Sequence, residues 1–176
     1  WKPGDVNLVF QAPDPAAVQP PGGWTLEDIE SVEGQHRSEW TGEDTAVLYL
    51  LYLPGAWHGS TPEHQILGLA YGPSQMVIFP DSVAAVCTPG KANIEDPEAR
   101  DLLCPLTEAA VWIHELGHLV GLVDAGVPMV NDHEDPEHPY HCHDVGCIMH
   151  WSHESGDLAT YIEKRLQRQP HPPPPL

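Results

Sequence analysis

The fold of this chain is decided by residues 107–124, TEAAVWIHELGHLVGLVD. Apolar residues occur on nearly every side of a helix drawn through this stretch, which predicts a buried helix over residues 107–121. Thr107 is a suitable N-cap for that helix. His114 and His118 are four residues apart, so the helix places both imidazoles on one face, one turn apart. Two imidazoles at this spacing can bind one tetrahedral Zn²⁺ ion, each through a neutral nitrogen at about 2.0–2.1 Å.

Glu115 follows His114 directly and lies beside such a metal instead of on it. A carboxylate in this position can take a proton from a metal-activated water and pass it to a leaving amine. Placing two histidines and a glutamate in an apolar helix costs free energy unless something compensates their polar groups. The stretch therefore favours a zinc site over the alternative, two core histidines satisfied by hydrogen bonds alone.

The run His114-Glu115-x-x-His118-x-x-Gly121-x-x-Asp124 resembles the metzincin clan of zinc endopeptidases. The third zinc ligand of that clan occupies the position of Asp124, normally as His and in snapalysin-like members as Asp. The resemblance makes Asp124 one candidate for the third ligand.

A second run, His141-Cys142, four residues and then Cys147-x-Met149, resembles the archaemetzincin arrangement. There the third zinc histidine is followed at once by Cys, and a Cys-x-Met supplies the Met-turn under the metal. The resemblance implies His141 as a ligand and Met149 as the Met-turn. About seventeen extra residues separate His141 from the preceding glycine in this chain, and the later Cys-x-x-Cys of the archaemetzincin structural zinc is missing.

The third ligand stays open between His141 and Asp124, with His133 and His138 as further candidates. His133, Asp135 and His138 also have a spacing that could hold a second cation in the loop 132–138, although a solvated acidic loop is the favoured interpretation. His143, His150 and His153 are interpreted as residues at the surface or behind the ligands.

Upstream, Gly68, Leu69 and Ala70 lie in a β-type run, 66–71, that resembles the metzincin edge strand pairing with an extended substrate. Any β-hairpin could produce the same run. Further strands are expected at 6–10, 46–53 and 75–79, with helices from 25 onward and at 157–167. After residue 80, turn formers predominate up to residue 100, and 124–147 reads as a long loop.

The expected fold is an α/β (α+β) metzincin-like zincin domain. It contains a twisted mixed sheet of four or five strands, an active-site helix, a backing helix and a C-terminal helix after the Met-turn. One domain spans 1–170, with an upper part of about 1–121 and a lower part of about 122–168, and a Pro-rich tail follows at 170–176.

The chain carries 7 Lys and Arg against 26 Asp and Glu, a formal net charge of −19. Phosphate contacts need a basic patch, so this balance excludes a nucleic-acid-binding protein. No apolar run approaches the roughly 18 residues of a membrane span. We expect a monomer with no membrane span.

Four cysteines form an even set: Cys87, Cys104, Cys142 and Cys147. Two disulfides in an oxidising compartment are expected, most simply Cys87–Cys104 and Cys142–Cys147, although three pairings are open. The protein is therefore expected to be secreted, periplasmic or exposed on the cell surface.

These residues predict a zinc-dependent endopeptidase acting on peptides or proteins, with one catalytic Zn²⁺ and Glu115 as general base and acid. The acidic composition weakly favours substrates with basic side chains. The alternative is a zinc-binding structural or interaction module, in which a fourth protein ligand closes the metal site.

Overall fold

Three short strands form the larger sheet of the computed structural model, which describes residues 19–62, 64–88, 94–154 and 157–168. They are β1 (Tyr49–Tyr52), β2 (Gly68–Ala70) and β3 (Gln75–Ile78). β3 lies in the middle, parallel to β1 and antiparallel to β2, with Leu69 opposite Val77. β2 is consequently an edge strand.

The expected strands at 46–53, 66–71 and 75–79 are present with shorter bounds, but the expected sheet of four or five strands is wrong for the described residues. Residues of the 124–147 segment form a separate two-stranded sheet instead of extending the larger one. The expected strand at 6–10 lies outside the described residues. The fold is therefore mixed α+β, with sheets of two and three strands.

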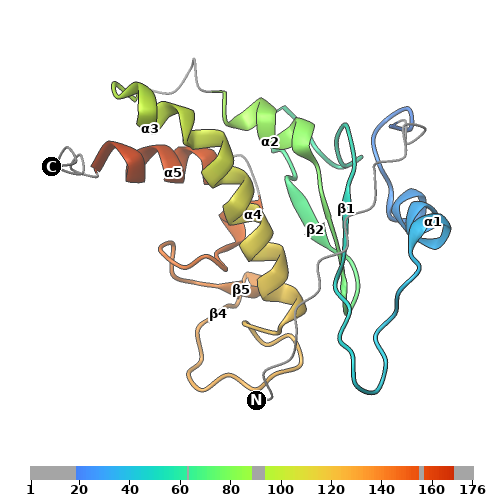
Figure 1. Cartoon of the computed structure of the whole chain (residues 1–176). Helices are drawn as coiled ribbons and strands as arrows, with labels where there is room; N and C mark the ends of the chain where they lie inside the picture. The colour runs from blue at the N-terminus through green and yellow to red at the C-terminus, as the bar shows by residue number, and fades with distance from the viewer. Residues whose placement is uncertain (1–18, 63, 89–93, 155–156, 169–176) are drawn as a thin grey trace, which may run out of the picture.

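Helices cover both faces of the larger sheet (Figure 1). The alternating side chains of the strands explain this arrangement. Leu51, Val77 and Phe79 pack with Ile29 on one face, where α1 (Leu26–His36) lies. Ile78 packs with Val111 on the other, where α4 (Leu103–Leu119) lies.

α1 begins with a capping box. The Thr25 hydroxyl accepts a hydrogen bond from the Asp28 backbone N–H, and the Asp28 carboxylate accepts one from the Thr25 N–H. The predicted helix start is thus confirmed. Near the other end of α1 lies a buried ion pair that was not predicted, with Arg37 Nη1 2.6 Å from Glu33 Oε1.

α4 begins at Leu103, four residues before the predicted start, so Thr107 is not its N-cap. The missing N–H of Pro105 falls in the first turn, where it costs no hydrogen bond. Thr107 is buried inside the helix, and its hydroxyl donates to the Leu103 carbonyl at 2.8 Å. The helix is also less buried than predicted, because Ile113 is 54% exposed.

Glycine ends α4 at the predicted place. Gly121 has a φ of +73°, and the N–H groups of Gly121 and Leu122 bond to the carbonyls of His118 and Gly117. This is the Schellman arrangement, which satisfies the last carbonyls of a helix and reverses the chain.

Two short helices, both with proline in the first turn, occupy part of the region expected to consist of turns. α2 (Pro80–Val86) ends at Cys87, and α3 (Pro97–Asp101) precedes α4. The predicted disulfide between Cys87 and Cys104 is present and joins the end of α2 to the first turn of α4.

The lower part of the molecule contains β4 (Glu134–Asp135), β5 (His138–Cys142), the 3-10 helix η2 (Trp151–Glu154) and α5 (Asp157–Arg168). α5 packs against α4 through the buried Leu158. The Cys142 N–H donates to the Met149 carbonyl at 2.8 Å and ties β5 to the segment that enters η2.

The predicted disulfide between Cys142 and Cys147 is wrong, since both residues are free thiols. Cys142 is buried beside Met149. Burial raises the pKa of the Cys142 thiol, and a hydrogen bond to the Cys147 side chain also raises it. Both effects favour the protonated thiol, which is less reactive than the thiolate.

Among the described residues, none of the helices has the length and apolar content needed to cross a membrane. The Cys87–Cys104 disulfide is typical of proteins from oxidising compartments.

Candidate metal centre

α4 places His114 and His118 one turn apart on the side of the helix that faces the lower part of the molecule. His114 is fully buried and His118 partly buried. The Nε2 atoms of the two rings lie 3.1 Å apart.

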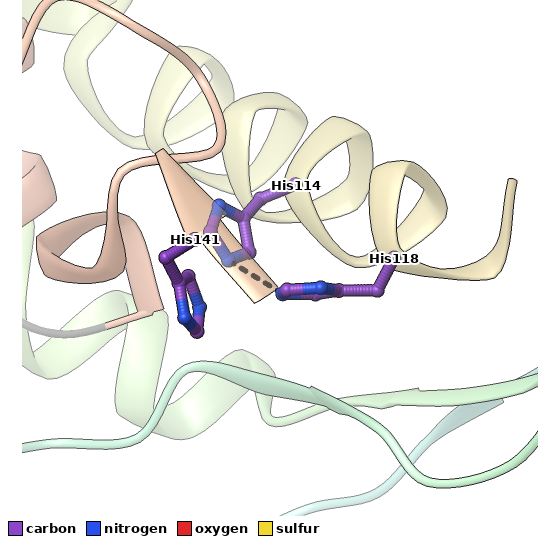
Figure 2. A group of neighbouring side chains, drawn as sticks. All are labelled: His114, His118 and His141. Carbon is purple, nitrogen blue, oxygen red and sulfur yellow. Dashed lines mark hydrogen bonds between the residues drawn. The ribbon is translucent and has the colours of Figure 1, made fainter. Parts of the chain in front are cut away.

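His141 of β5 completes a group of three. Its ring centroid is 5.4 Å from that of His114 and 4.9 Å from that of His118. One ligand nitrogen from each residue lies within 4.8 Å of the other two. Figure 2 shows the three rings turned toward one another, two from the helix and one from the strand. Across the described part of the chain, no other group of three such side chains brings its ligand atoms together.

Backbone carbonyls fix the orientation of two of these rings. His114 Nδ1 lies 2.7 Å from the Ile148 carbonyl oxygen, and His141 Nδ1 lies 3.0 Å from that of Pro139. A carbonyl can only accept a hydrogen bond, so each Nδ1 carries the proton, and in the neutral ring Nε2 is then the nitrogen that can bind a metal. A carbonyl behind each ligand is the usual way in which proteins orient metal-binding histidines.

The donor set fits a zinc ion. Three neutral imidazoles suit Zn²⁺ and leave a fourth tetrahedral position for water or substrate. Nitrogens bound tetrahedrally at about 2.0–2.1 Å are roughly 3.3 Å apart, close to the 3.1 Å separation of His114 and His118. These three residues could hold a metal ion, and their chemistry favours zinc.

The segment after β5 forms the floor of the group. Met149 is buried against Gly117, where any added Cβ would collide with its sulfur. His153 is 1% exposed, and its Nδ1 lies 3.0 Å from the same Ile148 carbonyl that orients His114. Burial lowers the pKa of His153, which favours its neutral form. Sequence reasoning missed the Ile148 carbonyl, whereas the buried position of His153 behind His114 agrees with one of the two interpretations given for it.

Glu115 lies next to His114 and is buried between α4 and β2. The closest approach of the strand is at Gly68, where an added Cβ would come within 3.0 Å of Glu115 Cγ and 2.8 Å of Val111 Cγ1. Glycine at position 68 therefore lets the edge strand pass directly over the carboxylate.

A hollow of about 300 Å³ opens beside His118 and His141, between β2 and the end of α4. It is lined by Leu69, Ala70, Gly72, His118, Leu119, Ala125, Tyr140 and His141.

The other candidate ligands lie outside the group. Asp124 is exposed in the turn after α4. His138 pairs with Asp135, with Nδ1 2.9 Å from Oδ2, and stacks on the Trp151 ring at 4.4 Å. A hydrogen bond from the Glu137 backbone N–H lowers the pKa of Asp135, and a second hydrogen bond, from the His138 side chain, lowers it further. His133 is partly buried and joins no group of three among the described residues.

Comparisons of the chain with protein-family models, with curated proteins and with solved structures give no match.

Proposed function

We propose that this protein is a zinc-dependent endopeptidase of the metzincin type, acting outside the reducing cytosol. The observation that carries the proposal is the convergence of His114, His118 and His141, with Glu115 beside them and the edge of β2 passing above. Catalysis requires all three features on one side of the molecule.

A zinc ion held by the three histidines would polarise the scissile carbonyl and a water molecule. Glu115 then acts as the base. Its carboxylate removes a proton from the water, whose oxygen bonds to the carbonyl carbon. When the C–N bond breaks, the same carboxyl group gives this proton to the departing amine nitrogen. Burial of Glu115 keeps the proton from exchanging freely with solvent during the two transfers.

The edge of β2 supports an extended substrate. Leu69 lies directly opposite Val77. At either end of the ladder, the backbone N–H groups of Phe79 and Tyr71 each donate a hydrogen bond to a carbonyl of the opposite strand segment. Hydrogen bonding alternates along an antiparallel pair, so Gly68 and Ala70 direct their backbone groups away from β3. These groups can pair with a peptide backbone lying along α4.

The test is Glu115→Gln in zinc-loaded protein, assayed on a mixture of peptides by mass spectrometry. Cleavage should fall by about 10²–10⁴-fold, the usual contribution of a general base, while one zinc per chain is retained. Glu98→Gln removes an exposed carboxylate from α3 and serves as the matched control, with cleavage unchanged.

A zinc-binding structural module would give another result. The protein would bind one zinc tightly, cleave no peptide and be indifferent to Glu115→Gln. That outcome would overturn the proposed activity and favour a closed metal site.

A further inference from the structure

We infer that the hollow beside His118 binds one apolar side chain of the substrate, on the N-terminal side of the bond that is cleaved. The inference rests on the proposed function and specifies its substrate class. The hollow touches two of the three metal-binding histidines, so whatever occupies it lies next to the reacting bond.

The lining decides the chemistry of the occupant. Apart from the two histidines, the hollow is bounded by Leu69, Ala70, Gly72, Leu119, Ala125 and Tyr140, none of which is charged. The chain has 26 acidic residues, yet none of them lines this space. A basic side chain in this hollow would find no counter-charge in its lining, whereas an apolar side chain would bury apolar surface against Leu69, Ala70 and Leu119. The acidic composition of the chain favours substrates with basic side chains, but the lining of this hollow favours an apolar side chain instead.

The volume limits the size of the occupant. At about 300 Å³ the hollow lies at the lower end of the range of small-molecule sites, which is about 300–1,000 Å³. It suits a single large aliphatic or aromatic side chain and not a longer segment.

The direction of β2 gives the position along the substrate. From Gly68, above Glu115, the strand runs toward Ala70 and Gly72 at the hollow. A peptide added to this edge is expected to run antiparallel, the more stable and more frequent pairing. Its N-terminal residues then lie beside Ala70, and its C-terminal residues lie beside Gly68. The side chain in the hollow thus precedes the scissile bond.

Cleavage-site sequencing of a proteome-derived peptide library by the zinc-loaded protein tests the inference. One position on the N-terminal side should favour Leu, Met, Phe or Ile over Lys and Asp by at least about tenfold, as hydrophobic pockets commonly do. Ala125→Phe partly fills the hollow. It should lower kcat/KM for these substrates by about tenfold and shift the preference toward Gly and Ala, with zinc content unchanged. Ala109→Phe, on the exposed side of α4, is the matched control.

Four results would overturn the inference. Cleavage without side-chain preference, or with a preference only after the scissile bond, would exclude this hollow as the specificity site while leaving the proposed activity intact. An unchanged preference in Ala125→Phe would do the same. Absence of any cleavage by the zinc-loaded protein would overturn the inference together with the proposed function.

Discussion

At the scale of single residues, the absence of a side chain at position 68 matters as much as the three histidines of the candidate metal centre. Gly68 brings the backbone of β2 within van der Waals distance of Val111 and Glu115. A methyl group there would force the neighbours to shift, and α4 is held too firmly by the sheet and α5 to yield. Glu115 is the more adjustable neighbour because its side chain has more rotatable bonds. The carboxylate would therefore be displaced.

Gly68→Ala should lower peptide cleavage by at least about tenfold, since small displacements of a catalytic group are costly. Overpacking should also lower the free energy of unfolding by about 1–3 kcal/mol. Zinc stoichiometry should not change, because the three heavy atoms nearest to an added Cβ at position 68 belong to Val111 and Glu115 and not to a histidine. Cleavage assays, denaturant titration and metal analysis measure the three quantities.

Gly34→Ala is the control for the Gly68 variant. Gly34 lies in α1 with open space around its Cα, so alanine should raise stability by about 0.5–1 kcal/mol through helix propensity. Full activity in Gly68→Ala would show that Glu115 does not depend on the close approach of β2.

Sequence reasoning at this scale succeeded where spacing alone determines geometry. The helical repeat was sufficient to place His114 and His118 together. Bringing His141 to them required a resemblance, because it lies twenty-three positions after His118 and beyond the end of the helix, where the helical repeat no longer applies. The Ile148 carbonyl had no detectable signal, because every residue has a carbonyl and only the fold determines where it points.

At the scale of elements, local chemistry predicted some boundaries and misplaced others. The start of α1 was predictable because a capping box acts within four residues. The start of α4 was misplaced because Thr107 is a good N-cap by type, whereas Pro105 in the first turn hid the true beginning at Leu103. α2 and α3 are too short to show a helical period, so proline at their starts was their main signal.

The capping box of α1 should make stability depend on pH. Hydrogen bonds from Thr25 to the Asp28 carboxylate lower the pKa of Asp28 below its usual 3.8. The folded state therefore binds this proton less readily than the unfolded state, and the carboxylate stabilises the fold above about pH 4. That contribution is lost as the pH falls through the lowered pKa of the folded state.

Asp28→Asn should lower the unfolding midpoint of the protein at pH 6, and its difference from wild type should shrink as the pH falls through the lowered pKa of Asp28. Thermal unfolding at a series of pH values measures this difference. Glu30→Gln, an exposed change of equal charge on α1, separates the local effect from net charge. A difference between Asp28→Asn and wild type that is constant with pH would contradict the assignment.

At the scale of the whole molecule, the candidate metal centre draws its residues from two separate elements, the helix α4 and the hairpin of β4 and β5. Two ligands come from α4 and one from β5, and the ladder of β4 and β5 is separate from the larger sheet. The sequence could not predict this separation, because a short strand pattern does not specify its partner. A metal ion held by the three histidines would add a link between α4 and this hairpin.

Removal of the metal should therefore lower the thermal stability of the whole protein. A ligand present at about 100 times its Kd stabilises the folded state by about 2.7 kcal/mol, which corresponds to about 5–10 °C in Tm for a chain of this size. Excess chelator should abolish that increment in wild type and in Asp124→Ala, since Asp124 lies outside the group. The Tm of His141→Ala should be close to that of the chelated wild type, and it should change little when zinc or chelator is added. If instead Asp124→Ala lost the response and His141→Ala kept it, the third ligand would be the aspartate and the position of β5 would be independent of metal.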